Sequence, residues 1–314
     1  MKTTFIRAVL MVTLIGLMAT GCIRAAPRKP APPAPGGEPT ISLYINETGE
    51  KKNIKLEEYV AGVVAAEMEP TWPVNALAAQ AILARTFTME NIKAGRVKQL
   101  HGTDASTSVE EFQAYNPSRI NDNVRRAVDL TRGEVAMHGG DYIKAWFNAC
   151  DGGVSASAAE GLAYTKTPTP YVKAGVRDNC LSITTPENRH WEKRIPLDQV
   201  RAAVQKITGQ DPGPVTSVRI VRRGPSGRAE ELQVGKVTVG GPALRLALGS
   251  DVVRSMLLTG ATVQGDSLVL TGKGFGHGVG MCQWGARLLA QQGRSPEDIV
   301  RFYFKDIEIR KLWQ

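Results

Sequence analysis

Apolar side chains recur at intervals of three and four residues between positions 56 and 67, which is the spacing of one face of an α-helix. Pro70 ends this pattern, because proline disfavours helical backbone in the residue before it. Pro73 can occupy a first helical turn, and an alanine-rich helix is predicted from there toward Gly95. The two segments predict a helical hairpin, with Glu67 near the end of its first helix.

The rest of the chain alternates between helical and strand-like patterns. Gly139 and Gly140 separate two apolar runs, 133–137 and 142–147, which predict a β-hairpin. Ser295 is a predicted N-cap for a last helix that reaches Phe304. The other predicted elements are helices at 120–130, 251–258 and from Gln283, and strands at 215–221, 231–239 and 267–270. This order predicts an α+β fold, with the helical hairpin and further helices packed on a mostly antiparallel sheet. One large domain and two lobes with a cleft between them are both compatible with it.

The N-terminus has the pattern of a secretion signal. Lys2 and Arg7 precede an apolar stretch over 8–18, which is short for a membrane-spanning helix, and Cys22 follows a run of small residues. Residues 1–22 therefore predict a lipoprotein-type signal with lipidation of Cys22. Ordinary secretion and an uncleaved anchor are the alternatives.

Proline dominates the next segment, 23–40, which has little apolar bulk. Such segments are extended and semi-rigid, so we expect a tether between a membrane and a folded domain at 41–314. The net charge of +9 suits an anionic wall or membrane surface. The basic residues are dispersed and no nucleic-acid motif occurs, so we expect no nucleic-acid partner.

The most distinctive segment is 272–286, where glycine occupies every second position around His277 before Cys282, Gln283 and Trp284. Alternating glycines favour a tight loop, since glycine tolerates positive φ and close backbone contact. A phosphate loop is excluded because the Gly-Lys-Ser/Thr ending is missing. The segment is either the wall of a binding site or a structural turn.

This string, Gly-His-Gly-Val-Gly-Met-Cys-Gln-Trp-Gly-Ala, resembles the signature of the stage II sporulation protein D family of bacterial cell-wall proteins. Cys282 stands where that family usually has serine. A second block, 56–87, resembles the two helices of the same family in the same order, and the likeness runs from about residue 40 to the end. At 147–149 the chain reads Phe-Asn-Ala where the family has a Phe-His-Ser-type element.

The resemblance implies a lytic transglycosylase that cleaves peptidoglycan between N-acetylmuramic acid and N-acetylglucosamine and leaves 1,6-anhydro ends. Glu67 matches the catalytic acid/base of the family. Its apolar helix end predicts desolvation, which raises a carboxyl pKa above its ordinary value of about 4.3. Arg85 matches an arginine that is thought to line the same cleft. Gln80 is a weaker candidate that we expect to form a hydrogen bond between helices.

Three further side chains can serve a carbohydrate cleft. His277, Gln283 and Trp284 offer hydrogen bonds and a stacking face for a sugar. A histidine that only fastens the loop is an equal alternative for His277. Tyr171, in a Pro-Tyr-Val match to the family, is a candidate contact but more often a core residue.

The cysteines at 150, 180 and 282 leave an odd number once Cys22 is set aside. We expect a disulfide between Cys150 and Cys180. The alternatives are a zinc site that uses these cysteines with His190 or His277, and free thiols. No Cys-x-x-Cys spacing supports zinc, so no cofactor is expected to be required.

The leading hypothesis is a membrane-tethered enzyme on the extracytoplasmic face of the cytoplasmic membrane, held through Cys22. Its partners would be peptidoglycan glycan strands and a cell-wall amidase. The alternative is a non-catalytic, peptidoglycan-binding amidase enhancer. A solute-binding lipoprotein would explain Cys22 but would leave Glu67 without a role.

Overall fold

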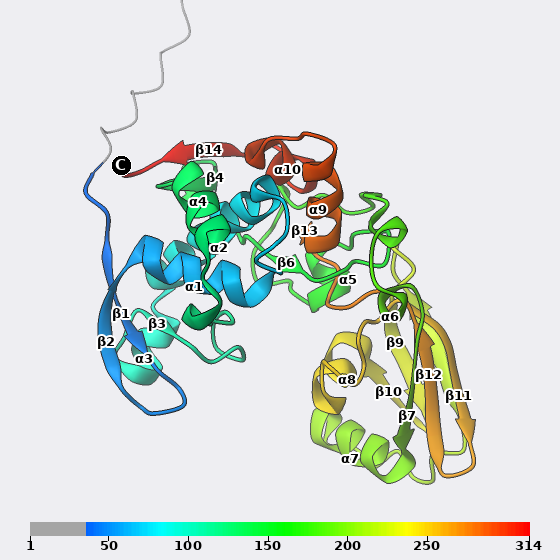
Figure 1. Cartoon of the computed structure of the whole chain (residues 1–314). Coiled ribbons are helices and arrows are strands. Elements are labelled where there is room, and N and C mark those ends of the chain that lie inside the picture. The colour runs from blue at the N-terminus through cyan, green and yellow to red at the C-terminus, as the bar shows by residue number, and fades with distance from the viewer. Residues whose placement is uncertain (1–35) are drawn as a thin grey trace, which may run out of the picture. The chain divides into compact units, whose positions relative to one another are not determined.

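The computed structural model describes residues 36–314 (Figure 1). The signal predicted at 1–22, Cys22 and the tether residues 23–35 lie outside the described residues. The tether was predicted to reach residue 40, but its last residues already belong to the folded part. The backbone N–H of Gly36 donates to the carbonyl of Leu312 at 2.8 Å, and Glu38 pairs with Arg132.

The helical hairpin is present. Helices α1 (Leu56–Glu67) and α2 (Val74–Ala94) lie against each other and against α4 (Asp122–Leu130) (Figure 1). Almost every apolar side chain of α1 is fully buried, and Gly62 lets the Tyr115 ring approach so closely that a Cβ would lie 2.2 Å from it. The chain leaves the helix at Met68, whose backbone is extended, so Glu67 occupies the last helical position.

Two small sheets flank these helices. Strands β1 (Thr40–Tyr44) and β2 (Lys51–Lys55) are antiparallel, and β3 (Ala105–Ser106) joins β1 in parallel. The second sheet has the order β14-β4-β5 and is antiparallel throughout. Its strands are β4 (Glu134–His138), β5 (Asp141–Tyr142) and β14 (Glu308–Lys311).

The hairpin predicted at 133–147 forms with a short second strand: β4 pairs with β5, and Gly139 and Gly140 at the turn have φ of 60° and 92°. Beyond β5 the chain leaves the sheet, and β6 (Phe147–Asn148) pairs in parallel with β13 (Met281–Cys282) instead. This pairing brings the middle of the chain to the glycine-rich string.

A separate apolar core lies between residues 191 and 272. It is built on two antiparallel sheets of order β10-β9-β8 and β11-β12-β7, with helices α7 and α8. The elements are β7 (Trp191–Pro196), α7 (Leu197–Thr208), β8 (Val218–Arg223), β9 (Ala229–Val234), β10 (Val237–Gly240), α8 (Gly241–Leu248), β11 (Leu258–Gln264) and β12 (Ser267–Gly272).

Two predictions in this region are wrong in detail. The single strand expected at 231–239 is split into β9 and β10 by a turn at Gly235, where φ is 54°. The helix expected at 251–258 does not form. The Arg245 guanidinium of α8 donates to the carbonyls of Val253 and Arg254, which fixes this segment in an irregular path, and Leu258 begins β11.

The remaining elements are short helices and the two C-terminal helices: α3 (Arg96–His101), η1 (Pro117–Arg119), α5 (Ala158–Leu162), η2 (Cys180–Ser182), α6 (Pro186–Arg189), α9 (Gln283–Gln291) and α10 (Pro296–Tyr303). The Ser295 hydroxyl accepts from the Asp298 N–H at 3.1 Å, so the predicted N-cap of the last helix is confirmed. The α+β class is confirmed as well.

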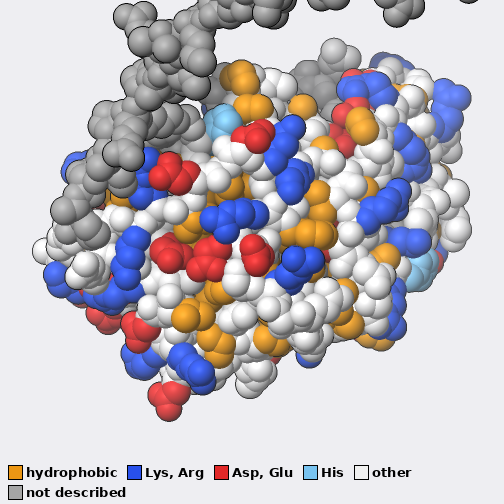
Figure 2. Space-filling view, turned by 90° about the horizontal axis from the view of Figure 1, so that it is seen from above, with side chains coloured by type: hydrophobic (Ala, Val, Ile, Leu, Met, Phe, Trp, Pro, Cys, Tyr) orange, Lys and Arg blue, Asp and Glu red, His pale blue; other side chains and the backbone are white. Residues whose placement is uncertain are grey.

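Basic and acidic side chains are intermingled over much of the face shown in Figure 2. Among the described helices, none has the length and apolarity needed to cross a membrane.

Candidate functional site

Glu67 is the centre of a small polar cluster that joins three distant segments. One carboxylate oxygen of Glu67 accepts from the Ala114 N–H at 3.2 Å. The Gln283 side-chain amide, at the start of α9, lies 3.5 Å from the other oxygen. The same amide lies 3.4 Å from the Gln80 oxygen of α2. Glu67, Gln80 and Gln283 are thus brought together, and Gln80 makes the interhelical contact expected of it.

A pocket of about 170 Å³ opens beside the Glu67 carboxylate. It is lined mainly by aromatic side chains and contains His277 from the glycine-rich string. The lining residues are Glu67, Phe87, Val109, Phe112, Gln113, Ala114, Trp146, Phe147 and His277. Glu67 is the acidic residue of this lining, and no second carboxylate from the described part of the chain contributes to it.

The pKa of Glu67 is raised above its usual value. Burial is the largest cause, because the apolar surroundings disfavour the charged form. The hydrogen bonds from Ala114 and Gln283 act in the opposite direction. The protonated acid therefore persists to higher pH than in an exposed glutamate, which suits a group that must donate a proton.

The glycine-rich string forms the tight loop that its pattern predicts. Gly274, Gly276, Gly278 and Gly280 all have positive φ, between 74° and 115°. At Gly278 a Cβ would lie 2.0 Å from the Arg228 guanidinium, so both conformation and space require glycine there. The loop is thus held by close backbone contacts.

His277 is neutral in this loop. Burial and, after it, the positive charges of Arg245 and Arg228 lower its pKa to about 3. The Val279 N–H donates to Nδ1 at 3.0 Å, which fastens the ring to its own loop. His277 thus holds the loop and also lines the pocket, and its contact with a sugar stays a prediction.

Trp284 is half-buried and lies outside the lining of the Glu67 pocket. Its ring centroid is 4.7 Å from that of Trp72, at an interplanar angle of 59°. The Arg287 guanidinium lies 5.0 Å from the centroid of each ring. Trp72, which the sequence did not indicate, doubles the aromatic surface here.

Tyr171 is a core residue, which was the alternative to a role as a substrate contact. It is 8% exposed and its hydroxyl accepts from the Lys144 N–H at 2.9 Å. It borders a different pocket, near Glu90 and His138. The structure does not bring Tyr171 to Glu67.

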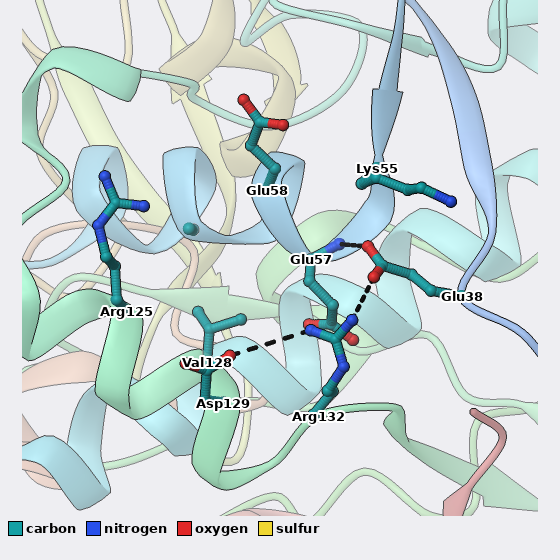
Figure 3. Close-up of a pocket in the computed structure, with 9 residues that line it drawn as sticks. Glu38, Lys55, Glu57, Glu58, Arg125, Val128, Asp129 and Arg132 are labelled. Atoms are coloured by element: carbon teal, nitrogen blue, oxygen red, sulfur yellow. Dashed lines mark hydrogen bonds and ion pairs between the residues drawn. The ribbon is translucent and has the colours of Figure 1, made fainter. Parts of the chain in front are cut away.

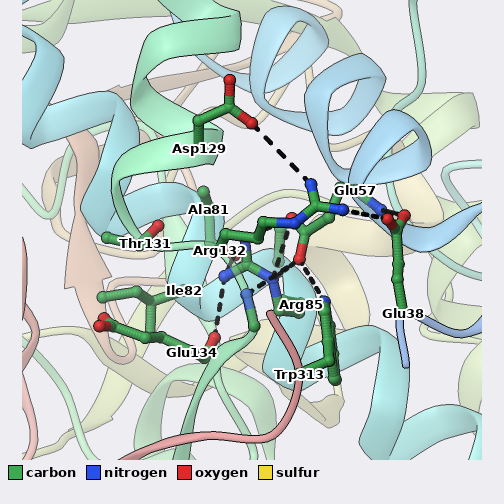
Figure 4. Close-up of polar contacts among 12 residues, drawn as sticks. Glu38, Glu57, Ala81, Ile82, Arg85, Asp129, Thr131, Arg132, Glu134 and Trp313 are labelled. Carbon is green, nitrogen blue, oxygen red and sulfur yellow. Dashed lines mark hydrogen bonds and ion pairs between the residues drawn. The ribbon is translucent and has the colours of Figure 1, made fainter. Parts of the chain in front are cut away.

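Arg85 was expected to line the cleft, and this expectation is wrong. Its side chain is fully buried and forms an ion pair with Glu57 at 2.6 Å (Figure 4). It also donates to the Glu134 carbonyl at 2.8 Å. Glu57 precedes Glu67 by ten residues on α1, which is about 15 Å along a helix axis. Arg85 therefore anchors the opposite end of α1.

A wider pocket of about 340 Å³ lies at that opposite end of α1 (Figure 3). Some of its charged groups pair with one another, since Arg132 contacts Glu38 and also Asp129 at 3.9 Å. The Glu38 carboxylate in addition accepts the Glu57 N–H at 3.0 Å and caps α1. These contacts fix the start of the folded chain, so we place the candidate active site at Glu67.

The region that holds Glu67, Gln80 and Arg85 matches a known family model. Residues 44–138 match the model described as stage II sporulation protein. A stage II sporulation protein D of Bacillus amyloliquefaciens is 30% identical over 303 residues, which covers 87% of this chain and 81% of the relative. The chain belongs to the stage II sporulation protein D family.

Two other proteins are similar to this chain. An uncharacterized protein of Brachyspira hyodysenteriae is 31% identical over 85% of this chain and 68% of its own length. A Bacillus subtilis protein described as an amidase enhancer is 26% identical over 77% of this chain and 39% of its own length. Residues 178–280, which include the separate apolar core, match a domain of unknown function.

Two of the positions that depart from the family pattern, Asn148 and Cys282, are direct neighbours. They face each other across the β6–β13 pair, and the Asn148 amide reaches the Met281 carbonyl at 3.3 Å. In this family member the missing histidine and the additional cysteine thus occupy one place in the fold.

The cysteines differ from the expected disulfide. Cys150, Cys180 and Cys282 are free and buried, and the Sγ atoms of Cys150 and Cys180 are 3.5 Å apart. Their donor atoms form one cluster, and no histidine of the described residues joins it. His190 is exposed and His277 is fastened to Val279, so the zinc site with histidine ligands is not formed. Cys282 as a third member was not anticipated, because its neighbours are far away in sequence.

Proposed function

We propose that this protein acts on the bacterial cell wall as a lytic transglycosylase, with Glu67 as its single general acid/base. The observation that carries the proposal is the Glu67 carboxyl, with its raised pKa, as the acidic group of an aromatic-lined pocket. The relatives described as stage II sporulation protein D support a role in wall remodelling.

The reaction needs one group that first donates and then accepts a proton. Protonated Glu67 would donate to the glycosidic oxygen between N-acetylmuramic acid and N-acetylglucosamine as the bond to C1 breaks. Its carboxylate would then take the proton of the C6 hydroxyl of the muramyl residue as that oxygen closes on C1. Hydrolysis would usually need a second carboxylate, for water or as nucleophile. A pocket with one carboxylate is therefore better suited to ring closure.

Gln283 and the Ala114 N–H are well placed to hold the carboxylate in position. The amide of Gln283 reaches both Glu67 and Gln80, so its orientation is fixed from two sides. A side chain held this way keeps Glu67 aimed through both proton transfers. We assign Gln283 a positioning role in this reaction.

A non-catalytic amidase enhancer is the second candidate, favoured by the relative of that description. Such a protein would bind glycan strands and stimulate a separate amidase. For either function we propose an extracytoplasmic location with attachment through lipidated Cys22.

Product analysis separates the two candidates. The full chain would be incubated with intact and with peptide-stripped glycan strands, and the products would be identified by mass spectrometry. We expect 1,6-anhydro-muramyl ends from the wild type and none from Glu67→Gln. Glu69→Gln is the matched control, because Glu69 is exposed and pairs with Arg119 at the surface. Glycan binding without cleavage of either substrate would leave the enhancer and refute the enzyme.

A further inference from the structure

Three buried thiols converge beside the glycine-rich loop. Cys150, Cys180 and Cys282 are each 0% exposed, and their Sγ atoms all lie within 4.8 Å of one another. They come from three separate segments: the chain after β6, the short helix η2, and the junction of β13 with α9. Their convergence is therefore a product of the tertiary fold.

The spacing of the thiols suits a tetrahedral metal ion. Zinc–sulfur bonds of about 2.3 Å at tetrahedral angles separate two sulfur ligands by about 3.8 Å. The Cys150 and Cys180 sulfur atoms are 3.5 Å apart, and the main-chain bonds of Cys150 with Phe275 hold the first of them in place. Three thiolates at such distances would fill three positions of a zinc site.

A carboxylate with an unused oxygen lies next to two of the thiols, because Asp151 forms a group with Cys180, Cys282 and Asp178 whose donor atoms lie within 4.8 Å of one another. Asp151 is 0% exposed, and its Oδ2 has no hydrogen-bond partner. Its Oδ1 accepts from the Gly153 N–H at 2.8 Å and lies 3.3 Å from the Cys180 sulfur. A fully buried, unpartnered carboxylate oxygen is costly unless a cation or donor reaches it. Asp151 is the natural fourth ligand.

Neighbouring groups orient the cluster as outer-shell contacts orient metal ligands. The Cys282 sulfur accepts from the Gly285 N–H at 3.3 Å and from the Asp151 N–H at 3.5 Å. The Asp178 carboxylate accepts from the Cys180 N–H at 2.9 Å and from the Tyr303 hydroxyl at 2.7 Å. Each of these contacts limits the movement of a thiol or of its segment.

A buried positive charge balances the site. Arg228 is 1% exposed, and its guanidinium donates to the carbonyls of Asp151 and Val154 and to the Ser226 hydroxyl. Among the ion pairs of the described residues, none involves Arg228. Three thiolates and a carboxylate around a divalent ion leave net negative charge, which would compensate this cation.

We propose that Cys150, Cys180 and Cys282, with Asp151 as the fourth ligand, bind one zinc ion. Four protein ligands close the coordination sphere, so the ion is structural. It links the segment after β6 to the first turn of α9, where Gln283 begins. The thiols lose their protons when the metal binds, which makes the affinity fall at low pH.

The metal content of the full chain, purified without chelators, tests the proposal. We expect one zinc per chain by elemental analysis, and sulfur-to-metal charge-transfer absorption after exchange for cobalt(II). Cys282→Ser and Asp151→Asn should each weaken zinc binding by roughly ten- to hundred-fold or more. Asp104→Asn is the matched control, since Asp104 does not belong to the cluster, and it should keep full zinc.

The cobalt spectrum of the unchanged chain decides the question even where a variant fails to fold. An intact mass two hydrogens below that of the reduced chain, with no bound metal, would show a disulfide and overturn the proposal. Stoichiometric zinc that survives both Cys282→Ser and Asp151→Asn would place the metal elsewhere and would also overturn it.

Discussion

Replacement of Arg85 by methionine should destabilise the fold and spare the chemistry. Three contacts join the guanidinium to the Glu57 carboxylate, at 3.0, 3.3 and 2.6 Å, and a fourth bond reaches the Glu134 carbonyl. Methionine fills much of the same volume but leaves Glu57 in the core without a counter-charge. The perturbation therefore isolates the ion pair from the packing around it.

The loss of one partner of a buried ion pair costs about 3–5 kcal/mol. Glu57 would retain two donors, the Gly133 N–H at 3.0 Å and the Trp313 indole N–H at 2.7 Å. These bonds favour the lower end of the range, so we expect a loss of about 3 kcal/mol in the free energy of unfolding. At about 2–4 °C per kcal/mol, Tm should fall by about 6–12 °C.

Thermal and urea unfolding of the wild type and Arg85→Met measure this loss. Lys93→Met is the matched control on the same helix, because its ion pair with Asp141 is exposed, and we expect no measurable change in Tm. The double variant Arg85→Met with Glu57→Leu should recover part of the loss, since no unpaired charge stays in the core.

Glycan cleavage by Arg85→Met, measured well below its Tm, should stay within a few-fold of the wild type. An unchanged Tm together with lost glycan binding would refute the structural role. It would restore Arg85 as a substrate contact.

Three further predictions concern the Glu67 site. Folding raises the pKa of Glu67, so an ionised Glu67 destabilises the folded state. This loss in the free energy of unfolding is absent below the pKa of Glu67 in the unfolded chain and grows as the pH rises toward its pKa in the folded state. Glu67→Gln should therefore be more stable than the wild type at neutral pH and show no such advantage near pH 4, as urea titrations at several pH values would reveal. Gln283→Leu removes a hydrogen bond that lowers the pKa of Glu67, so the basic limb of the pH–rate profile should move to higher pH while the maximal rate falls; an unmoved limb would contradict the contact. Gly278→Ala should cost about 1–3 kcal/mol more than Gly293→Ala in chemical unfolding, because φ is positive at both sites but only the first has the Arg228 guanidinium in the way.

Local patterns determined much of what the sequence could predict. The hairpin of α1 and α2 follows from helical periodicity and two prolines, and the glycine loop follows from residues that alone tolerate its φ values. The resemblance to a family named Glu67, Gln283 and His277 as site residues. In the structure Glu67 and His277 line one pocket, and the Gln283 amide lies 3.5 Å from the Glu67 carboxylate. These elements are encoded within short stretches.

Most of the errors involve contacts that a local pattern does not show, whereas the turn at Gly235 that splits the strand expected at 231–239 is local. The position of Arg85 on an alanine-rich helix does not reveal that Glu57, 28 residues earlier, faces it in the core. An apolar run at 251–258 has the composition of a helix, but bonds from Arg245 and the pairing of β11 with β12 determine its path. The clustering of Cys282 with Cys150 and Cys180 depends on the pairing of β6 with β13, and no local sequence pattern predicts that pairing.

Cleavage of glycan strands in water labelled with heavy oxygen tests the central claim most directly. If Glu67 acts alone and directs the C6 hydroxyl onto C1, the new muramyl ends should be anhydro sugars that carry no label. The wild type should release them, and Glu67→Gln should release none. Labelled reducing ends would show that water attacks C1, and would contradict the single-carboxylate mechanism.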